Sequence, residues 1–132
     1  MLIEKLPRNI TLVLAYRRPL VMMQGIDETF DGVIFLGYHT IKTNPQGVRA
    51  HTMSSASLAG VRLNGVSMPE AGVNAAIAGH FNVPVIMISG DDAIIKEATA
   101  LLGDIEGAVV KWAYGCRSPK LDPASVFKSL TC

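Results

Sequence analysis

Short hydrophobic runs recur along the chain, and segments of helical periodicity separate several of them. Thr11–Tyr16 and Gly32–Leu36 are apolar runs bounded by Arg, Pro and Gly, the pattern of strands buried on both faces. Pro84–Ser89 and Gly107–Ala113 repeat this pattern towards the carboxyl end. Each run is too short for a core helix, so the sequence predicts four buried strands.

Two segments of about ten residues have the features of helices. Pro69–Phe81 begins with a proline, carries an acidic residue in its first turn, and then places apolar residues at helical spacing. Ala93–Leu102 follows the acidic pair Asp91–Asp92 and stops at Gly103. We interpret the acidic pair as a helix cap rather than as a metal-binding or acid/base pair, because it directly precedes the helix.

Three shorter elements complete the prediction. Leu20–Gly25 favours one or two helical turns, and Pro123–Leu130 favours a final short helix. Leu58–Met68 places Asn64-Gly65 between two short alternating runs, which predicts a tight hairpin. Strands alternating with helices indicate an α/β fold, with a mostly parallel sheet flanked by helices and a small β-hairpin excursion. At 132 residues we expect a single domain over residues 1–132.

The composition is apolar and nearly neutral. Hydrophobic residues make up 49% and charged residues 17% of the chain, against roughly 25% charged in typical soluble domains. This excludes intrinsic disorder and favours additional burial at an interface. Lys and Arg total 12 and Asp and Glu total 11, with no basic cluster, so we expect no nucleic-acid partner.

The apolar runs and the cysteines bear on location. The runs are far shorter than the roughly 18 residues of a membrane span, and no secretory signal pattern opens the chain, so we expect no membrane association. Two cysteines, Cys116 and Cys132, are too few for a disulfide framework. They are more simply interpreted as reduced thiols, which predicts a cytoplasmic protein.

The candidate chemistry lies just after the second predicted strand, because ligands of open α/β sheets bind beyond the carboxyl ends of the strands. His39 follows that strand, His51 lies twelve residues further on, and Glu70 opens the next helix. Two imidazoles and a carboxylate form a donor set that Zn²⁺ accepts. An isolated histidine in a loop is usually only solvated, and no HExxH-type motif is present, so the spacing alone leaves both interpretations open.

Five ordered motifs resemble the D-aminopeptidases of the dipeptide-operon type. The resemblance covers about residues 3 to 120, and its motifs are GIDETFDG (25–32), FLGYH (35–39), GVRAHTM (47–53), PEAGVNA (69–75) and VPVIMISGDD (83–92). It implies that His39 and Glu70 are zinc ligands and that His51 is the catalytic histidine, acting as base or nucleophile. It also implies peptides with amino-terminal D-residues as substrates and assembly into a closed homo-oligomer.

The resemblance also has departures. In that family an Asp-x-Glu-Gly segment after the first strand and a further histidine complete a two-zinc site, and this sequence has neither at its amino end. Asp104-Ile105-Glu106-Gly107 spells the tetrapeptide, but it precedes a strand, so we do not assign it that role. His39 and Glu70 supply only two ligands, whereas a catalytic zinc needs about three. We therefore expect a truncated or fragmentary member of the family, with weak or absent zinc binding.

Two functions remain open on the sequence alone. The first is a zinc-dependent aminopeptidase that releases amino-terminal D-amino acids. The alternative is a catalytically inactive α/β fragment that serves as an assembly or small-molecule-binding module. Two further residues have predicted supporting roles: Asn74, one helical turn after Glu70, is expected to orient that carboxylate, and His80 is expected to be structural.

Overall fold

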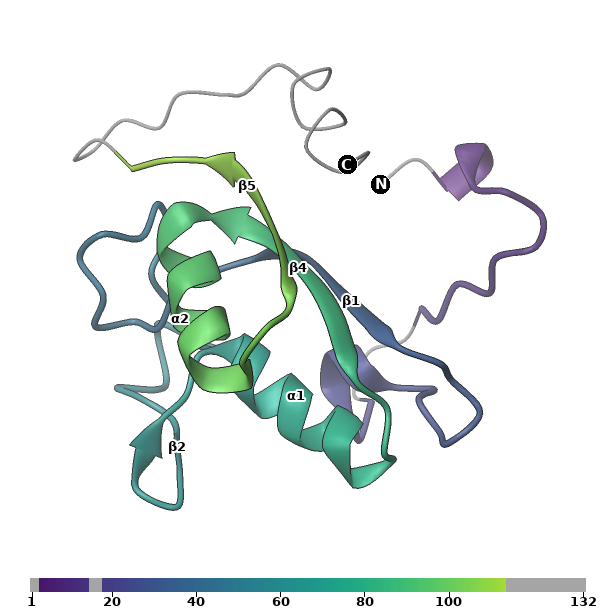
Figure 1. The fold of residues 1–132 in the computed structure, drawn as a ribbon, viewed down its shortest axis with the longest axis horizontal. Coiled ribbons are helices and arrows are strands. Elements are labelled where there is room, and N and C mark those ends of the chain that lie inside the picture. The colour runs from purple at the N-terminus through teal and green to yellow at the C-terminus, as the bar shows by residue number, and fades with distance from the viewer. Residues whose placement is uncertain (1–2, 15–17, 114–132) are drawn as a thin grey trace.

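A three-stranded parallel sheet with two helices forms the body of the protein (Figure 1). The computed structural model describes residues 3–14 and 18–113. The sheet has the order β1-β4-β5, and helices connect its strands as β1 (Val33–Tyr38), α1 (Glu70–His80), β4 (Val85–Asp91), α2 (Asp92–Leu102) and β5 (Glu106–Lys111). Both strand pairs are parallel. The predicted α/β class is confirmed.

The short elements agree with the hydrophobic pattern. Arg62–Leu63 (β2) and Val66–Ser67 (β3) pair antiparallel around Asn64 and Gly65, whose φ angles of 48° and 81° are those of a primed hairpin turn. The predicted helical turns after Leu20 appear as the 3-10 helix η2 (Val21–Met23). A second 3-10 helix, η1 (Ile3–Lys5), was not predicted.

The core lies between the sheet and the two helices. Phe35 and Ile88 come from adjacent strands, and Ile94 comes from α2; all three are at most 1% exposed. The remaining members of the core cluster are small residues of the helices and one residue of η2: Ala71, Ala78, Ala98 and Met23. The alanines let the two helices lie close to the sheet, because their side chains end at Cβ.

One predicted strand does not form over its described residues. Residues 11–14 of the predicted strand Thr11–Tyr16 are irregular, and Val13 and Leu14 are 41% and 66% exposed. An apolar run becomes a strand only where a neighbouring strand pairs with it, and the hydrophobic pattern does not reveal the neighbour. Residues 15–17 and the predicted helix Pro123–Leu130 lie outside the described residues.

Within the described ranges, no helix is both long and apolar enough to cross a membrane. The longest, α1 and α2, have 11 residues each.

The two strands next to the site approach each other closely at Gly90. This residue lies opposite Tyr38 in the parallel pair β1–β4. A Cβ added at Gly90 would overlap the Ile94 side chain and lie 2.6 Å from the backbone oxygen of Tyr38. The backbone oxygen cannot move aside without disturbing β1, so only glycine fits here.

We predict that Gly90→Ala lowers the free energy of unfolding by about 1 to 3 kcal/mol, the usual cost of overpacking. Gly79→Ala is the matched control, because a Cβ there meets no atom within 4 Å and Gly79 lies in a helix. It should raise the free energy of unfolding by up to about 1 kcal/mol. Urea denaturation measures the free energy of unfolding of both variants. Equal effects of the two substitutions would show that the close contact at Gly90 does not exclude a side chain.

Candidate active site

His39 lies at the carboxyl edge of the sheet, as predicted. It directly follows Tyr38, the last residue of β1, where the chain has just passed through the positive φ of 71° at Gly37. Its Nδ1 atom is buried and has no hydrogen-bond partner among the described residues. An unpaired buried ring nitrogen is costly unless another group satisfies it, which sets His39 apart from an ordinary solvated histidine.

His51 returns to the same place at the end of a loop. Its backbone N–H donates to the backbone oxygen of Thr40 at 3.0 Å, which closes the loop over residues 40–51 at its base. The rings of His39 and His51 are consequently close, with centroids 4.9 Å apart. Nδ1 of His51 lies 3.3 Å from the backbone oxygen of Arg49, a distance at which a protonated Nδ1 donates and leaves Nε2 as the basic nitrogen.

Glu70 lies beside His51 because of the direction of α1. A helix that connects parallel strands runs back along the sheet, so its first residue starts at the carboxyl edge. Oε1 of Glu70 lies 4.0 Å from Nε2 of His51 and accepts the backbone N–H of Met53 at 2.8 Å. The carboxylate also lies in the first turn of α1, where the helix dipole favours negative charge.

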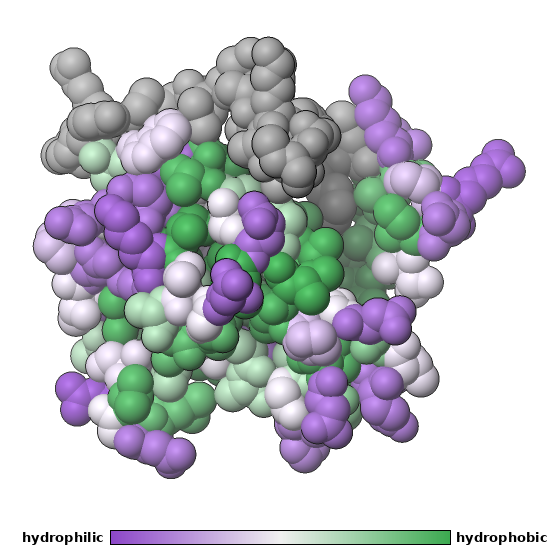
Figure 2. All heavy atoms as spheres, in the orientation of Figure 1, coloured by the Kyte–Doolittle hydropathy of each residue, from purple (hydrophilic) through white to green (hydrophobic). Residues whose placement is uncertain are grey.

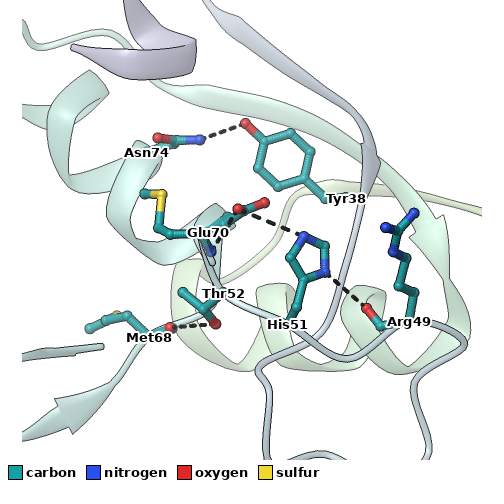
Figure 3. A network of polar contacts seen from close by, with 8 residues as sticks. Tyr38, Arg49, His51, Thr52, Met68, Glu70 and Asn74 are labelled. Atoms are coloured by element: carbon teal, nitrogen blue, oxygen red, sulfur yellow. Dashed lines mark hydrogen bonds and ion pairs between the residues drawn. The ribbon is translucent and has the colours of Figure 1, made fainter. Parts of the chain in front are cut away.

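Figure 3 shows His51 between the Glu70 carboxylate and the backbone oxygen of Arg49, with Tyr38 and Asn74 above them. The fully buried Asn74 donates through Nδ2 to the hydroxyl oxygen of Tyr38 at 2.7 Å. The prediction that Asn74 orients Glu70 is therefore wrong. Asn74 lies one helical turn after Glu70, but the Asn74 side chain points to β1. Burial raises the pKa of the Tyr38 phenol, an effect that the Asn74 hydrogen bond opposes and the charge of Glu70 reinforces.

The environment keeps His39 neutral. Burial lowers the pKa of its imidazole, and electrostatic repulsion by the neighbouring basic groups of Lys111, His51 and Arg49 lowers that pKa further. Asp91 opposes this shift more weakly. Neutral imidazole is the form that ligates metals, so the site favours the metal-binding form of His39 at neutral pH.

The donor set fits zinc in kind but not in number. The buried, unpaired Nδ1 of His39 and the carboxylate of Glu70 are donors of the types that Zn²⁺ prefers. No group of three or more His, Cys, Asp or Glu side chains in the described part of the chain is arranged to hold a metal ion. A catalytic zinc held by these residues therefore needs at least one further ligand.

The other candidate residues lie elsewhere. His80 is the last residue of α1, about 15 Å along the helix from Glu70, and its ring packs edge-on against Phe81 at 5.0 Å. Glu106 begins β5 and Asp104 precedes it, so both lie at the amino edge of the sheet, opposite His39. They are not placed to complete the donor set at the carboxyl edge.

Sequence reasoning missed the contacts that hold the loop over residues 40–51. Asp91 was correctly predicted to cap α2, and its Oδ1 accepts the Ile94 N–H at 2.8 Å, but its Oδ2 also accepts the Val48 N–H at 2.8 Å. Glu97 accepts the backbone N–H of Ile41 at 3.0 Å. These partners are more than 40 residues apart in sequence, so no local pattern reveals them.

Comparisons with known proteins agree with the residue pattern. The sequence model of the peptidase M55 family, described as D-aminopeptidase, matches residues 1–131. A D-aminopeptidase of Bacillus subtilis (strain 168) is 38% identical over an alignment of 135 residues, gaps included, which covers 99% of this chain and 47% of that protein. The solved structure of the Zn-dependent D-aminopeptidase DppA from Bacillus subtilis, a self-compartmentalizing protease, is similar with a TM-score of 0.86 and 37% identity, over 98% of this chain and 47% of that one. The chain thus spans about half the length of the relatives it matches.

The lowered pKa of His39 has a testable consequence. Its imidazole should titrate with a midpoint below the ordinary 6.5, measured by NMR on the ring protons. The folded chain disfavours protonated His39, so this residue's contribution to stability is present above pH 6.5 and is lost as the pH falls through the lowered pKa. A midpoint at or above 6.5 would contradict the described environment.

Proposed function

The chain belongs to the peptidase M55 family of D-aminopeptidases, and from that membership we propose that it carries the metal and base residues of a zinc-dependent aminopeptidase that releases amino-terminal D-amino acids from peptides. One observation carries the proposal: His39, His51 and Glu70 come from three segments and meet at the carboxyl edge of the sheet. Most pairs of loop and helix residues with such sequence separations do not meet.

We assign His39 and Glu70 as zinc ligands. The buried Nδ1 of His39 lacks a protein partner among the described residues, and its lowered pKa keeps the ring neutral. Glu70 holds its carboxylate at the start of α1, fixed by the Met53 N–H. When bound, zinc supplies a Lewis acid that activates water and polarises the amide carbonyl.

We assign His51 as the general base. With Nδ1 donating to the backbone oxygen of Arg49, the free electron pair lies on Nε2, which faces Glu70 at 4.0 Å. In the proposed reaction Nε2 takes the proton from the attacking water and later gives it to the leaving amine. The hydrogen bond from Nδ1 to the backbone oxygen of Arg49 holds the imidazole in place during both steps.

We also propose a homo-oligomer that acts in the cytoplasm. The Bacillus subtilis relative is described as a self-compartmentalizing protease, which supports self-association. This chain leaves large apolar side chains exposed on β1 and β4: Leu36 is 72%, Ile34 is 51% and Ile86 is 50% exposed. Figure 2 shows hydrophobic residues gathered across the middle of one face, with hydrophilic residues around its margin. Such a surface favours association.

A second function has one observation in its favour. An open pocket of about 680 Å³ lies beside β1 and is lined largely by apolar side chains, among them Met22, Phe30 and Phe35. Its size is that of a small-molecule site. A catalytically inactive member of the family could use such a pocket for binding alone.

The activity is tested in a chimera that joins this chain to the part of the Bacillus subtilis D-aminopeptidase that it does not cover. With zinc, the chimera should release alanine from a peptide with amino-terminal D-alanine faster than from its L-alanine isomer. His51→Ala should lower kcat about 10²- to 10⁴-fold and leave bound zinc nearly unchanged, because a base acts mainly in the transition state. His39→Ala should lose both zinc and activity.

His80→Ala is the matched control, because His80 lies at the other end of α1 and should change neither zinc content nor kcat. If His51→Ala strips zinc as completely as His39→Ala, His51 is a ligand rather than the base. A folded, zinc-loaded chimera without D-selective release would favour the binding function instead.

Association is tested separately on this chain. Light scattering at micromolar concentration should give a mass of at least two chains, because burial of the exposed apolar residues of β1 and β4 stabilises an interface. Leu36→Lys should shift the mass towards the monomer, and a monodisperse monomer of the unchanged chain would contradict the proposed assembly.

A further inference from the structure

The loop over residues 40–51 has little regular structure of its own, yet it delivers His51. In the described structure it contains no helix or strand. Its base is closed by the hydrogen bond from the His51 N–H to the Thr40 oxygen. This bond fixes the backbone of His51 at one point, but a single hydrogen bond does not hold a long irregular loop in one form, so the direction of the His51 side chain depends on further contacts.

The first of these contacts comes from Asp91. Its side chain is fully buried, and its two oxygens accept different backbone N–H groups, those of Ile94 in α2 and Val48 in the loop, each at 2.8 Å. The ion pairs found among the described residues do not include Asp91. A buried carboxylate without a cation is stable only when N–H groups and a helix N-terminus satisfy it. Val48 therefore supplies half of the hydrogen bonds that this charge needs.

The second contact comes from Glu97, six residues further along α2. Its Oε2 accepts the backbone N–H of Ile41 at 3.0 Å, and its Oε1 accepts from Nδ2 of Asn44 at 2.6 Å. Both oxygens of this carboxylate are therefore used by the loop. Hydrogen bonds to ionised acceptors are shorter and stronger than those between neutral groups.

Gly47 shows that the loop is also tightly packed. A Cβ at this position would overlap the fully buried side chain of Thr40. The loop thus folds back on its own first residue, and the contacts to Asp91 and Glu97 hold it in that form.

We propose that Asp91 and Glu97 are positioning residues for the active site: they fix the loop over residues 40–51 to α2 and thereby hold the His51 imidazole beside His39 and Glu70. The inference deepens the proposed function, since it rests on the assignment of His51 as the base, but its structural part holds whether or not the chain binds zinc. The cap of α2 alone does not account for these contacts, because a cap requires one oxygen of Asp91 and none of Glu97.

The experiment separates the two roles of Asp91, as the cap of α2 through Ile94 and as the contact of the loop through Val48. Asp91→Ser keeps a good capping residue for Ile94 but its single, shorter oxygen cannot also serve Val48. In the 132-residue chain without zinc, NMR hydrogen exchange should show the Val48 N–H exchanging about 10- to 100-fold faster, with the Ile94 N–H still protected. The nuclear Overhauser effect between the His39 and His51 rings should weaken. Asp92→Ser, at an exposed ion pair with Lys96, should change neither.

Glu97→Gln provides an independent variant that leaves the cap untouched. It keeps the size of the side chain but only one acceptor oxygen, so the Ile41 N–H or the Asn44 amide loses its partner. Exchange at Ile41 should accelerate in either case, because a neutral amide oxygen is a weaker acceptor than a carboxylate. The contact between the histidine rings should again weaken. If Asp91→Ser fails to fold, Glu97→Gln alone tests whether the contacts with α2 hold the loop over residues 40–51.

Activity tests the positioning role. In the chimera with the Bacillus subtilis enzyme, Asp91→Ser and Glu97→Gln should lower kcat about 10- to 100-fold with a much smaller change in KM, because a misplaced base affects the transition state more than substrate binding. Faster exchange with unchanged kcat would overturn the positioning role while leaving the proposed function intact. Unchanged exchange at Val48 and Ile41 would overturn the structural basis. An inactive but zinc-loaded chimera with intact loop contacts would instead count against the proposed function.

Discussion

The parallel pairing of β1 with β4 places the start of the loop over residues 40–51 beside the start of α2. Tyr38 lies opposite Gly90, so the chain leaves β1 at His39 next to the point where β4 passes into α2 at Asp91. The loop over residues 40–51 can therefore reach the acidic side chains of α2 and return to its own base. Because α1 connects the same two parallel strands, its first residue, Glu70, must also start at this edge. One strand pairing thus brings together segments that are separated by some 50 residues.

Electrostatics then distinguishes the groups gathered at this edge. The buried charge of Asp91 is stabilised by backbone N–H groups and a helix N-terminus. Its role is structural, because it joins Val48 of the loop to the start of α2. Burial and nearby cations hold the pKa of His39 low, which favours a neutral ligand. The Glu70 carboxylate faces the basic nitrogen of His51. Each role follows from the local environment, since none of these residue types has a fixed role in general.

The fold was largely predictable because it depends on short-range patterns. Apolar runs and turn residues such as Asn64-Gly65 predicted β1, β4, β5, the hairpin and both long helices to within a few residues. The prediction was wrong for residues 11–14, the described part of Thr11–Tyr16, because an apolar run does not show whether a pairing strand exists. The three candidate site residues were found from their position after a strand and from the family resemblance. The contacts of Asp91 and Glu97 with the loop over residues 40–51 were not predicted. Hydrogen bonds between side chains and backbone groups more than 40 residues apart depend on the tertiary structure.

The central claim is that the carboxyl edge of the sheet binds zinc through His39 and Glu70. X-ray absorption spectroscopy at the zinc edge of the metal-loaded chimera tests it most directly, because it reports ligand types and distances. The account predicts imidazole nitrogen and carboxylate oxygen at about 2.0 to 2.2 Å, with the His39→Ala variant losing an imidazole contribution. Sulfur ligands at about 2.3 Å, as Cys116 and Cys132 would provide, or an unchanged imidazole count in His39→Ala, would contradict it.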